Sequence, residues 1–237
     1  MSDGHTSGDE CGFTARCEKS LLFGSPGLDG AQAEYVRVPY ADSTSVKAPK
    51  TISDRTLLLM ADIFPTGFFG VKSAVELSMN VDVAQSTMVV IGCGPVGLCA
   101  IAAASSLNPQ HLFAVDAVDS RLEVARKLGA KPLNFKQDAD EMRKRVMEAT
   151  NGRGADIVVE VVGLSPALRT AFELVRPFGV ISSIGVHNAE AELMKEIKHY
   201  NAHVSRFMFD HVMPLAQAVE GYGLFEQMKV QKVIFRP

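Results

Sequence analysis

The stretch from Thr87 to Asp116, TMVVIGCGPVGLCAIAAASSLNPQHLFAVD, decides the fold. It begins with a short apolar run, residues 88–91, that is typical of a strand buried on both faces. A glycine turn with the spacing G-x-G-x-x-G follows at residues 92–97, and residues 95–107 have the composition of a buried helix. A second apolar run, residues 112–115, ends at Asp116. This order predicts two neighbouring parallel strands joined by a crossover helix.

The glycine turn has the chemistry of an anion-binding site. Gly92 allows a tight turn, Gly94 lets a pyrophosphate approach the backbone, and Gly97 lets the helix pack closely on the strand. Pro95 and Val96 begin the helix, whose free N–H groups and dipole favour a phosphate. We therefore predict that this turn holds the pyrophosphate of a dinucleotide. The alternative is a purely structural glycine turn between a core strand and a core helix.

Asp116 follows the last glycine by roughly 20 residues, the usual place of an acid that accepts hydrogen bonds from the adenosine ribose. A carboxylate at this position repels a 2′-phosphate, so the cofactor is predicted to be NAD rather than NADP. Arg121 lies close enough in the sequence to offset that repulsion, which leaves NADP as an alternative. Without a ligand, Asp116 would act only as a cap for the next helix.

Composition excludes several classes of function. The chain has 237 residues, of which 47% are hydrophobic and 22% charged, as in ordinary globular domains. Its net charge of −3 favours neither nucleic acid nor an anionic membrane as a partner, and no apolar run has the length of a membrane span. Residues 1–10 are polar and glycine-rich, so we expect a disordered start without a signal peptide. A cytoplasmic location follows by default.

The chain contains four cysteines, which do not form a disulfide framework. Cys93 and Cys99 lie in the glycine turn and the helix behind it, where we expect small buried thiols that pack rather than react. Cys11 and Cys17 have the spacing C-x5-C, which alone matches no strong zinc pattern.

Strand and helix patterns continue to alternate after Asp116. We expect strands at residues 131–134, 157–162 and 180–184, with helices between them; a capping box of Ser120 and Glu123 and a cap at Ser165 before Pro166 mark two helix starts. The fold class is therefore α/β, a doubly wound parallel sheet with helices on both faces. Ligands of such sheets bind at the carboxyl ends of the strands. Here these ends carry the glycine turn, Asp116, and the segments 162–163 and 185–186.

The two ends of the chain have other patterns. Residues 33–38 alternate like a strand, and Ser53 is a predicted cap for a helix through residues 57–61. Residues 65–67, Pro-Thr-Gly, are expected to interrupt that helix before a second one at residues 68–79. Towards the C-terminus, helices are predicted at residues 189–200 and 214–225, and a strand at residues 230–235.

Four segments together resemble the zinc-type medium-chain alcohol dehydrogenases. They are GAQAEYVRVP at 30–39, DIFPTG at 62–67, the glycine turn, and the ending with MPL at 213–215 and VQKV at 230–233. The likeness is to fungal and bacterial members near the formaldehyde and threonine dehydrogenases. It implies an NAD-dependent oxidoreductase of alcohols or aldehydes with two domains. A partial, mainly β catalytic domain would comprise residues 11–80 and 205–237, and the NAD-binding domain residues 81–204.

The resemblance also implies roles for single residues around the cofactor. Thr66 would touch the nicotinamide, although it is also explained as a cap beside Pro65. Asp116 and Arg121 would flank the adenosine ribose. The adenine and carboxamide ends would be lined by Val162, Gly185 and Val186.

The metal sites of the family are matched only in part. Asp62 resembles the third ligand of the catalytic zinc, and Cys17 resembles the last of four structural-zinc cysteines. The other catalytic ligands, which the family carries in an earlier segment, are absent, so the chain resembles a member truncated at its front. Zinc needs three protein ligands and an open position for catalysis, so zinc binding is doubtful and Asp62 is equally explained as a polar residue at a domain seam.

The region after His187 is shorter than in the family and lacks a sixth strand. The fifth strand would then form an open edge, through which two copies could pair.

Three hypotheses remain at this point. The first is an NAD-dependent dehydrogenase acting on a small alcohol or aldehyde. The second is a non-catalytic dinucleotide-binding remnant with a binding or regulatory role. The third is a partial product that does not fold stably, with apolar residues such as Tyr35, Val36 and Ile234 exposed for want of sheet partners.

Overall fold

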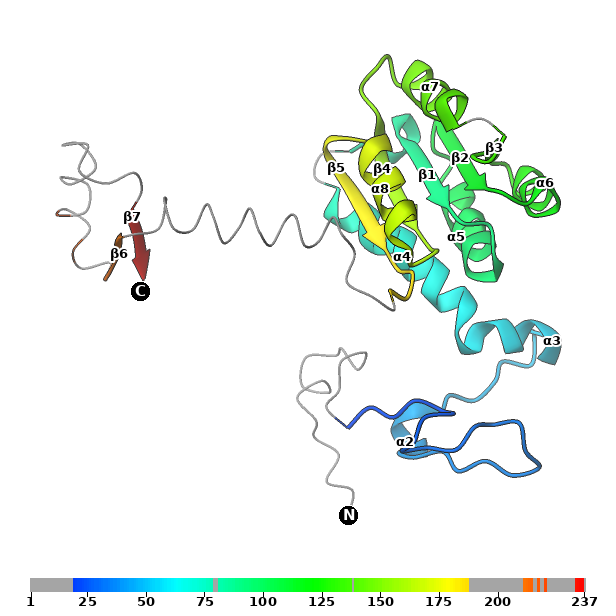
Figure 1. Ribbon diagram of the computed structural model, residues 1–237. Helices are drawn as coiled ribbons and strands as arrows, with labels where there is room; N and C mark the ends of the chain where they lie inside the picture. Colours follow the sequence, from blue (N-terminus) through cyan, green and yellow to red (C-terminus); the bar gives the residue numbers. More distant parts are fainter. Residues whose placement is uncertain are drawn as a thin grey trace. The chain divides into compact units, whose positions relative to one another are not determined.

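Five parallel strands form the central sheet, in the order β3-β2-β1-β4-β5 (Figure 1). Their bounds are β1 Thr87–Ile91, β2 His111–Asp116, β3 Lys131–Asn134, β4 Ala155–Glu160 and β5 Val175–Ser183. The computed structural model describes residues 19–78, 81–137, 139–187, 211–214, 217, 220 and 233–236. Contacts divide the chain into two units, residues 1–52 and 53–237, and the sheet belongs to the second.

Helices cover both faces of this sheet. They are α4 Ile63–Leu77, α5 Pro95–Ser106, α6 Asp119–Lys127, α7 Ala139–Ala149 and α8 Ser165–Leu174. One buried cluster joins β1, β2 and β4 to α4, α5 and α6, and a second joins the opposite face of the sheet to α7 and α8. The predicted α/β class with a doubly wound parallel sheet is confirmed.

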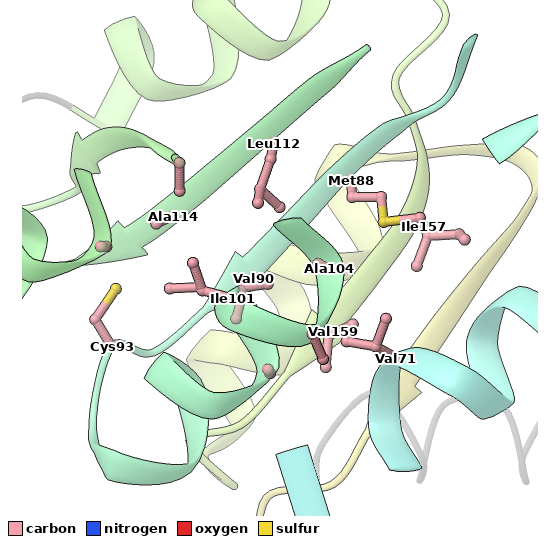
Figure 2. Close-up of a cluster of buried hydrophobic side chains, with 14 of the residues drawn as sticks. Val71, Met88, Val90, Cys93, Ile101, Ala104, Leu112, Ala114, Ile157 and Val159 are labelled. Atoms are coloured by element: carbon pink, nitrogen blue, oxygen red, sulfur yellow. The ribbon is translucent and has the colours of Figure 1, made fainter. Parts of the chain in front are cut away.

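The alternation of side chains along β1 explains why its apolar run is continuous. Met88 and Val90 point into the first cluster, whereas Val89 and Ile91 point into the second, and all four are at most 4% exposed. Figure 2 shows Val90 beside Ile101 of α5 and Met88 beside Ile157 of β4, and Val71 of α4 belongs to the same cluster.

The break before α4 lies earlier than predicted. Residues 65–67 do not interrupt a helix; they form its first turns, after a break at Asp62 that follows α3 (Asp54–Leu57) and the 3₁₀ helix η1 (Leu58–Ala61). Pro65 is tolerated because the N–H groups of the first turn have no partner within the helix. Thr66 is therefore an interior helix residue, not a cap.

Three other predictions concern helix starts. The Ser53 side chain accepts a hydrogen bond from the Thr56 N–H, which confirms the cap of α3. The capping box of Ser120 and Glu123 is wrong, because α6 begins at Asp119 and Glu123 instead binds Arg126 through two contacts of 2.8 Å. The predicted cap Ser165 is already the first residue of α8.

Residues 19–52 of the first unit are described by a short helix, α2 (Ala41–Thr44), and an isolated bridge between Ser25 and Leu28. The strand predicted at residues 33–38 is wrong: these residues are irregular, and the Tyr35 side chain is 90% exposed. An alternating pattern forms a strand only when a neighbouring strand pairs with it, and no partner strand lies among residues 19–52.

A second sheet consists of two parallel strands, β6 His211–Pro214 and β7 Val233–Arg236. Pro214 ends β6, so it does not start the helix predicted at residues 214–225; of the later residues of that helix only 217 and 220 are described, and both are helical. The strand predicted at residues 230–235 corresponds to β7. Four predictions concern residues outside the described ones: the helix at residues 189–200, the shortened region after His187, the role of Cys17, and the disorder expected at residues 1–10.

Within the described residues, no single helix has the length and apolar character needed to cross a membrane. The segment Asp54–Ala61 and helix α4 satisfy these criteria only together, as a pair bent by 55°. Part of α4 is buried against the sheet, where Val71 and Ala74 are at most 2% exposed.

Candidate dinucleotide-binding site

The carboxyl ends of β1 and β4 lie where the strand order of the sheet reverses, the place at which such sheets bind ligands. The chain runs from β1 outward to β3 and then returns to β4 on the other side of β1, which is the topological switch point of the sheet. Ile91 pairs with Glu160 there, and the N–H of Val161 donates to the Ile91 carbonyl at 3.0 Å. The glycine turn and the loop after β4 therefore leave the sheet side by side.

The three glycines of the turn meet different surroundings. Gly92 has φ +98°, and its N–H donates to the Val115 carbonyl at 2.8 Å. A Cβ on Gly97 would lie 1.8 Å from the Gly92 carbonyl oxygen, so only glycine fits between helix and turn. A Cβ on Gly94, in contrast, would meet nothing within 4 Å. The space in front of Gly94, ahead of Pro95 and Val96 at the start of α5, is open to a ligand, as the fingerprint requires.

Asp116 is held rigidly at the end of β2. Its Oδ2 accepts a hydrogen bond from the Cys93 N–H at 2.7 Å, and its Oδ1 accepts from Ala117 at 2.7 Å and Val118 at 2.9 Å. A carboxylate offers about four acceptor positions, so one remains for a further donor such as a ribose hydroxyl. The side chain of Arg121 lies 4.0 Å from Oδ2 and is half exposed.

Cys93 is a packing thiol. Its residue is fully buried, and burial, reinforced by the Asp116 charge and opposed by Arg121, raises the pKa of the thiol to about 12. Burial also raises the pKa of the Cys99 thiol. Both thiols therefore stay protonated at neutral pH, where a reactive cysteine would need a lowered pKa.

The loops after β4 and β5 touch through their backbones. Gly163 has φ +76°, and a Cβ there would lie 2.4 Å from the Val186 carbonyl oxygen. A Cβ on Gly185 would lie 2.1 Å from the Gly163 nitrogen. Val162 and Val186 are 42% and 80% exposed beside this contact. The structure thus brings Val162, Gly185 and Val186 together, and Val162 also lies close to Gly92.

A buried acid behind these loops was missed by the sequence reasoning. Glu160 ends β4, is 0% exposed, and accepts hydrogen bonds from the Val162 and Gly163 N–H groups at 2.7 Å and from the Ser183 hydroxyl at 2.7 Å. His187 lies 3.4 Å from the same carboxylate. The available signal was an acid within the apolar run at residues 157–162, because a charge in a buried strand requires partners.

Helix α4 crosses close to the turn. A Cβ on Gly67 would lie 2.7 Å from both the Val96 carbonyl oxygen and the Ala100 nitrogen, and a Cβ on Gly70 would meet the Ile184 side chain at 2.7 Å. Thr66 lies one residue before this contact in α4. Its hydroxyl donates to the Asp62 carboxylate at 3.1 Å.

The described residues do not provide a zinc site. Among them no three His, Cys, Asp or Glu side chains are grouped closely enough to hold a metal ion, and Asp62 has Thr66 as its hydrogen-bond partner.

Comparisons with known proteins place these features in a family. The zinc-binding dehydrogenase family matches residues 95–218. Zinc-type alcohol dehydrogenase B of Aspergillus flavus is 52% identical over 261 aligned residues, which cover 98% of this chain and 61% of that protein. Medium chain reductase/dehydrogenase ucsI of an Acremonium species is 58% identical over 74% of this chain and 60% of that protein. The chain therefore spans about three fifths of the length of these two relatives.

A solved structure agrees with the fold. The alcohol dehydrogenase TADH from Thermus sp. ATN1 superposes with a TM-score of 0.63 and 32% identity, covering 88% of this chain and 68% of that one. The strand order, the glycine turn and these matches lead to one conclusion: the chain belongs to the zinc-type medium-chain alcohol dehydrogenase family.

Proposed function

We propose that this chain binds NAD at the carboxyl ends of β1 and β4 and that it serves the NAD-dependent oxidation of an alcohol or reduction of an aldehyde. The observation that carries the proposal is the open space at Gly94, between the N-terminus of α5 and the fixed carboxylate of Asp116. When bound, NAD supplies a hydride acceptor at its nicotinamide.

The residues of the chain would bind and orient that cofactor. The turn from Gly92 to Gly97 would hold the pyrophosphate through backbone N–H groups, and Asp116 would accept a hydrogen bond from the adenosine ribose, with Arg121 beside it. The exposed side chains of Val162 and Val186, with Gly185, would line the apolar ends of the cofactor. Thr66 would contact the nicotinamide from α4.

A second candidate is a dinucleotide-binding protein without dehydrogenase activity. It is favoured by the surroundings of Asp62, because within the described residues Thr66 is its hydrogen-bond partner and no group of three metal ligands includes it. Three further predictions accompany either function: a catalytic domain made of residues 11–80 and 205–237, a cytoplasmic location, and the pairing of two copies through β5.

The two candidates are separated by measuring three properties of the same preparation: NAD affinity by calorimetry, zinc content by elemental analysis, and hydride transfer from a series of alcohols by the absorbance of reduced nicotinamide. Affinity with turnover supports the dehydrogenase. Affinity without zinc or turnover supports the binding protein, and the absence of affinity contradicts both.

A further inference from the structure

Glu160 joins the two loops that border the proposed cofactor site. Its Oε1 accepts hydrogen bonds from Val162 and Gly163 of the loop after β4, both at 2.7 Å. Its Oε2 accepts the Ser183 hydroxyl at the end of β5, also at 2.7 Å, and lies 3.4 Å from Nε2 of His187. One carboxylate therefore fixes backbone on one side of this site and side chains on the other.

His187 completes this connection from the loop after β5. Its Nε2 lies 3.0 Å from the Ser183 hydroxyl oxygen, and the hydrogen of that hydroxyl is used in the hydrogen bond to Glu160. Nε2 is therefore the donor in that contact, and the imidazole is oriented by Ser183 and Glu160 together. Because Nε2 is the donor in this contact, His187 does not accept the Ser183 proton, and the two residues are not arranged as a Ser-His nucleophile and base.

Burial makes this connection obligatory. Glu160 is 0% exposed, and a carboxylate in such a place is tolerated only when its oxygens are hydrogen-bonded. The backbones it connects are already in close contact, since Gly163 and Gly185 leave no room for a Cβ between the loops. We therefore expect a change in the Glu160 side-chain contacts to shift Gly185 and Val186, which follow Ser183.

We propose that Glu160, Ser183 and His187 are positioning residues that fix the loop after β5 against the loop after β4, and that they thereby set the affinity for the carboxamide end of NAD, which Gly185 and Val186 would line. The inference rests on the proposed function. Asp116 and the glycine turn would hold the adenosine half. Among the hydrogen bonds of the described residues, none joins either of them to the side chain of Glu160, Ser183 or His187. Loss of the contacts among Glu160, Ser183 and His187 should therefore weaken the binding of NAD much more than the binding of ADP.

The test compares NAD and ADP affinities of the full chain by calorimetry. His187→Ala removes the donor to Ser183, and we expect NAD binding to weaken about tenfold while ADP binding changes less than twofold. His187→Gln, whose amide can reach the Nε2 position, should restore most of the NAD affinity. Ser183→Ala should resemble His187→Ala. His111→Ala is the matched control, because His111 begins β2 at the opposite end of the sheet.

Thermal unfolding of each variant separates positioning from folding. If His187→Ala and Ser183→Ala bind NAD and ADP as tightly as the wild type, or if both ligands weaken equally, the inference is wrong while the proposed function stands. A wild-type chain that binds ADP but not NAD, or neither, overturns the proposed function and this inference together. A melting temperature that falls without a change in the NAD to ADP affinity ratio assigns the three residues a structural role only.

Discussion

The backbone N–H of Cys93 donates a hydrogen bond of 2.7 Å to Oδ2 of Asp116. This contact links the glycine turn after β1 to the end of β2, so the acid that would face the ribose also fixes the turn that would face the pyrophosphate. The two halves of the fingerprint are one rigid structure before any ligand arrives.

Replacement of Asp116 should therefore affect both binding and stability. Asp116→Ala leaves the buried Cys93 N–H without its acceptor, and we expect the free energy of unfolding to fall by about 1–3 kcal/mol. NAD affinity should fall at least about tenfold, while the preference for NAD over NADP should narrow because the repulsion of a 2′-phosphate is removed. Urea unfolding and calorimetry measure these changes. The control is Asp119→Ala, whose carboxylate binds Asn134 on the exposed surface; equal effects of the two changes would contradict the special role of Asp116.

Gly94 and Gly97 should respond to substitution in opposite ways. A side chain at Gly94 enters open space, so Gly94→Val should fold with a nearly unchanged melting temperature and lose detectable NAD binding. A methyl group at Gly97 would overlap the Gly92 carbonyl, so Gly97→Ala should lower the melting temperature strongly or prevent folding. Thermal unfolding of both variants checks the contrast, and NAD affinity that survives in Gly94→Val would place the ligand elsewhere.

Helix α4 should tolerate alanine at one glycine and not at the other. In Gly67→Ala the new methyl group meets backbone atoms of α5 at 2.7 Å. We expect the free energy of unfolding to fall by about 1–2 kcal/mol, although alanine has the better helix propensity. In Gly70→Ala the nearest atom is the end of the Ile184 side chain, which can rotate away, so the net change should be close to zero. Denaturant unfolding compares the two, and equal stabilities would mean that α4 does not pack tightly on α5.

Alkaline pH should destabilise the fold through Cys93. The folded-state pKa of this thiol is raised from 9.0 to about 12, so the unfolded chain loses its proton first as the pH rises. The contribution of the protonated thiol to the free energy of unfolding is fully present below pH 9. It declines between pH 9 and about 12, and about 1–2 kcal/mol is lost at pH 10. Cys93→Ala should remove this part of the difference between unfolding free energies at pH 8 and pH 10. An unchanged pH dependence in that variant would show that the thiol does not contribute.

The sheet could be predicted from the sequence because its strands are buried on both faces. Residues 88–91 and the run that ends in Asp116 are consecutive apolar side chains, and such runs are visible without knowledge of their neighbours. The glycine turn could be predicted equally well, because the need for glycine is local. The structure shows this at Gly92 and Gly97, where a side chain would be strained or would overlap neighbouring atoms.

Features that depend on distant partners could not be predicted in the same way. The alternating residues 33–38 would form a strand only beside another strand. The capping box expected from Ser120 and Glu123 does not form, and Glu123 makes an ion pair with Arg126 instead. Glu160 depends on Ser183, 23 positions further along the chain, so the spacing of residues within β4 gives no hint of it. The roles proposed for Thr66 and Asp62 rest on the family resemblance alone, and the structure adds their mutual hydrogen bond.

Calorimetric titration of the wild-type chain with NAD, with Gly94→Val measured alongside, addresses the proposed site most directly. We predict one saturable site per chain with a dissociation constant between about 1 µM and 1 mM, the usual range for enzyme substrates, and no binding to Gly94→Val. Absence of NAD binding by a wild-type chain that unfolds cooperatively, or equal binding by the two proteins, would contradict it.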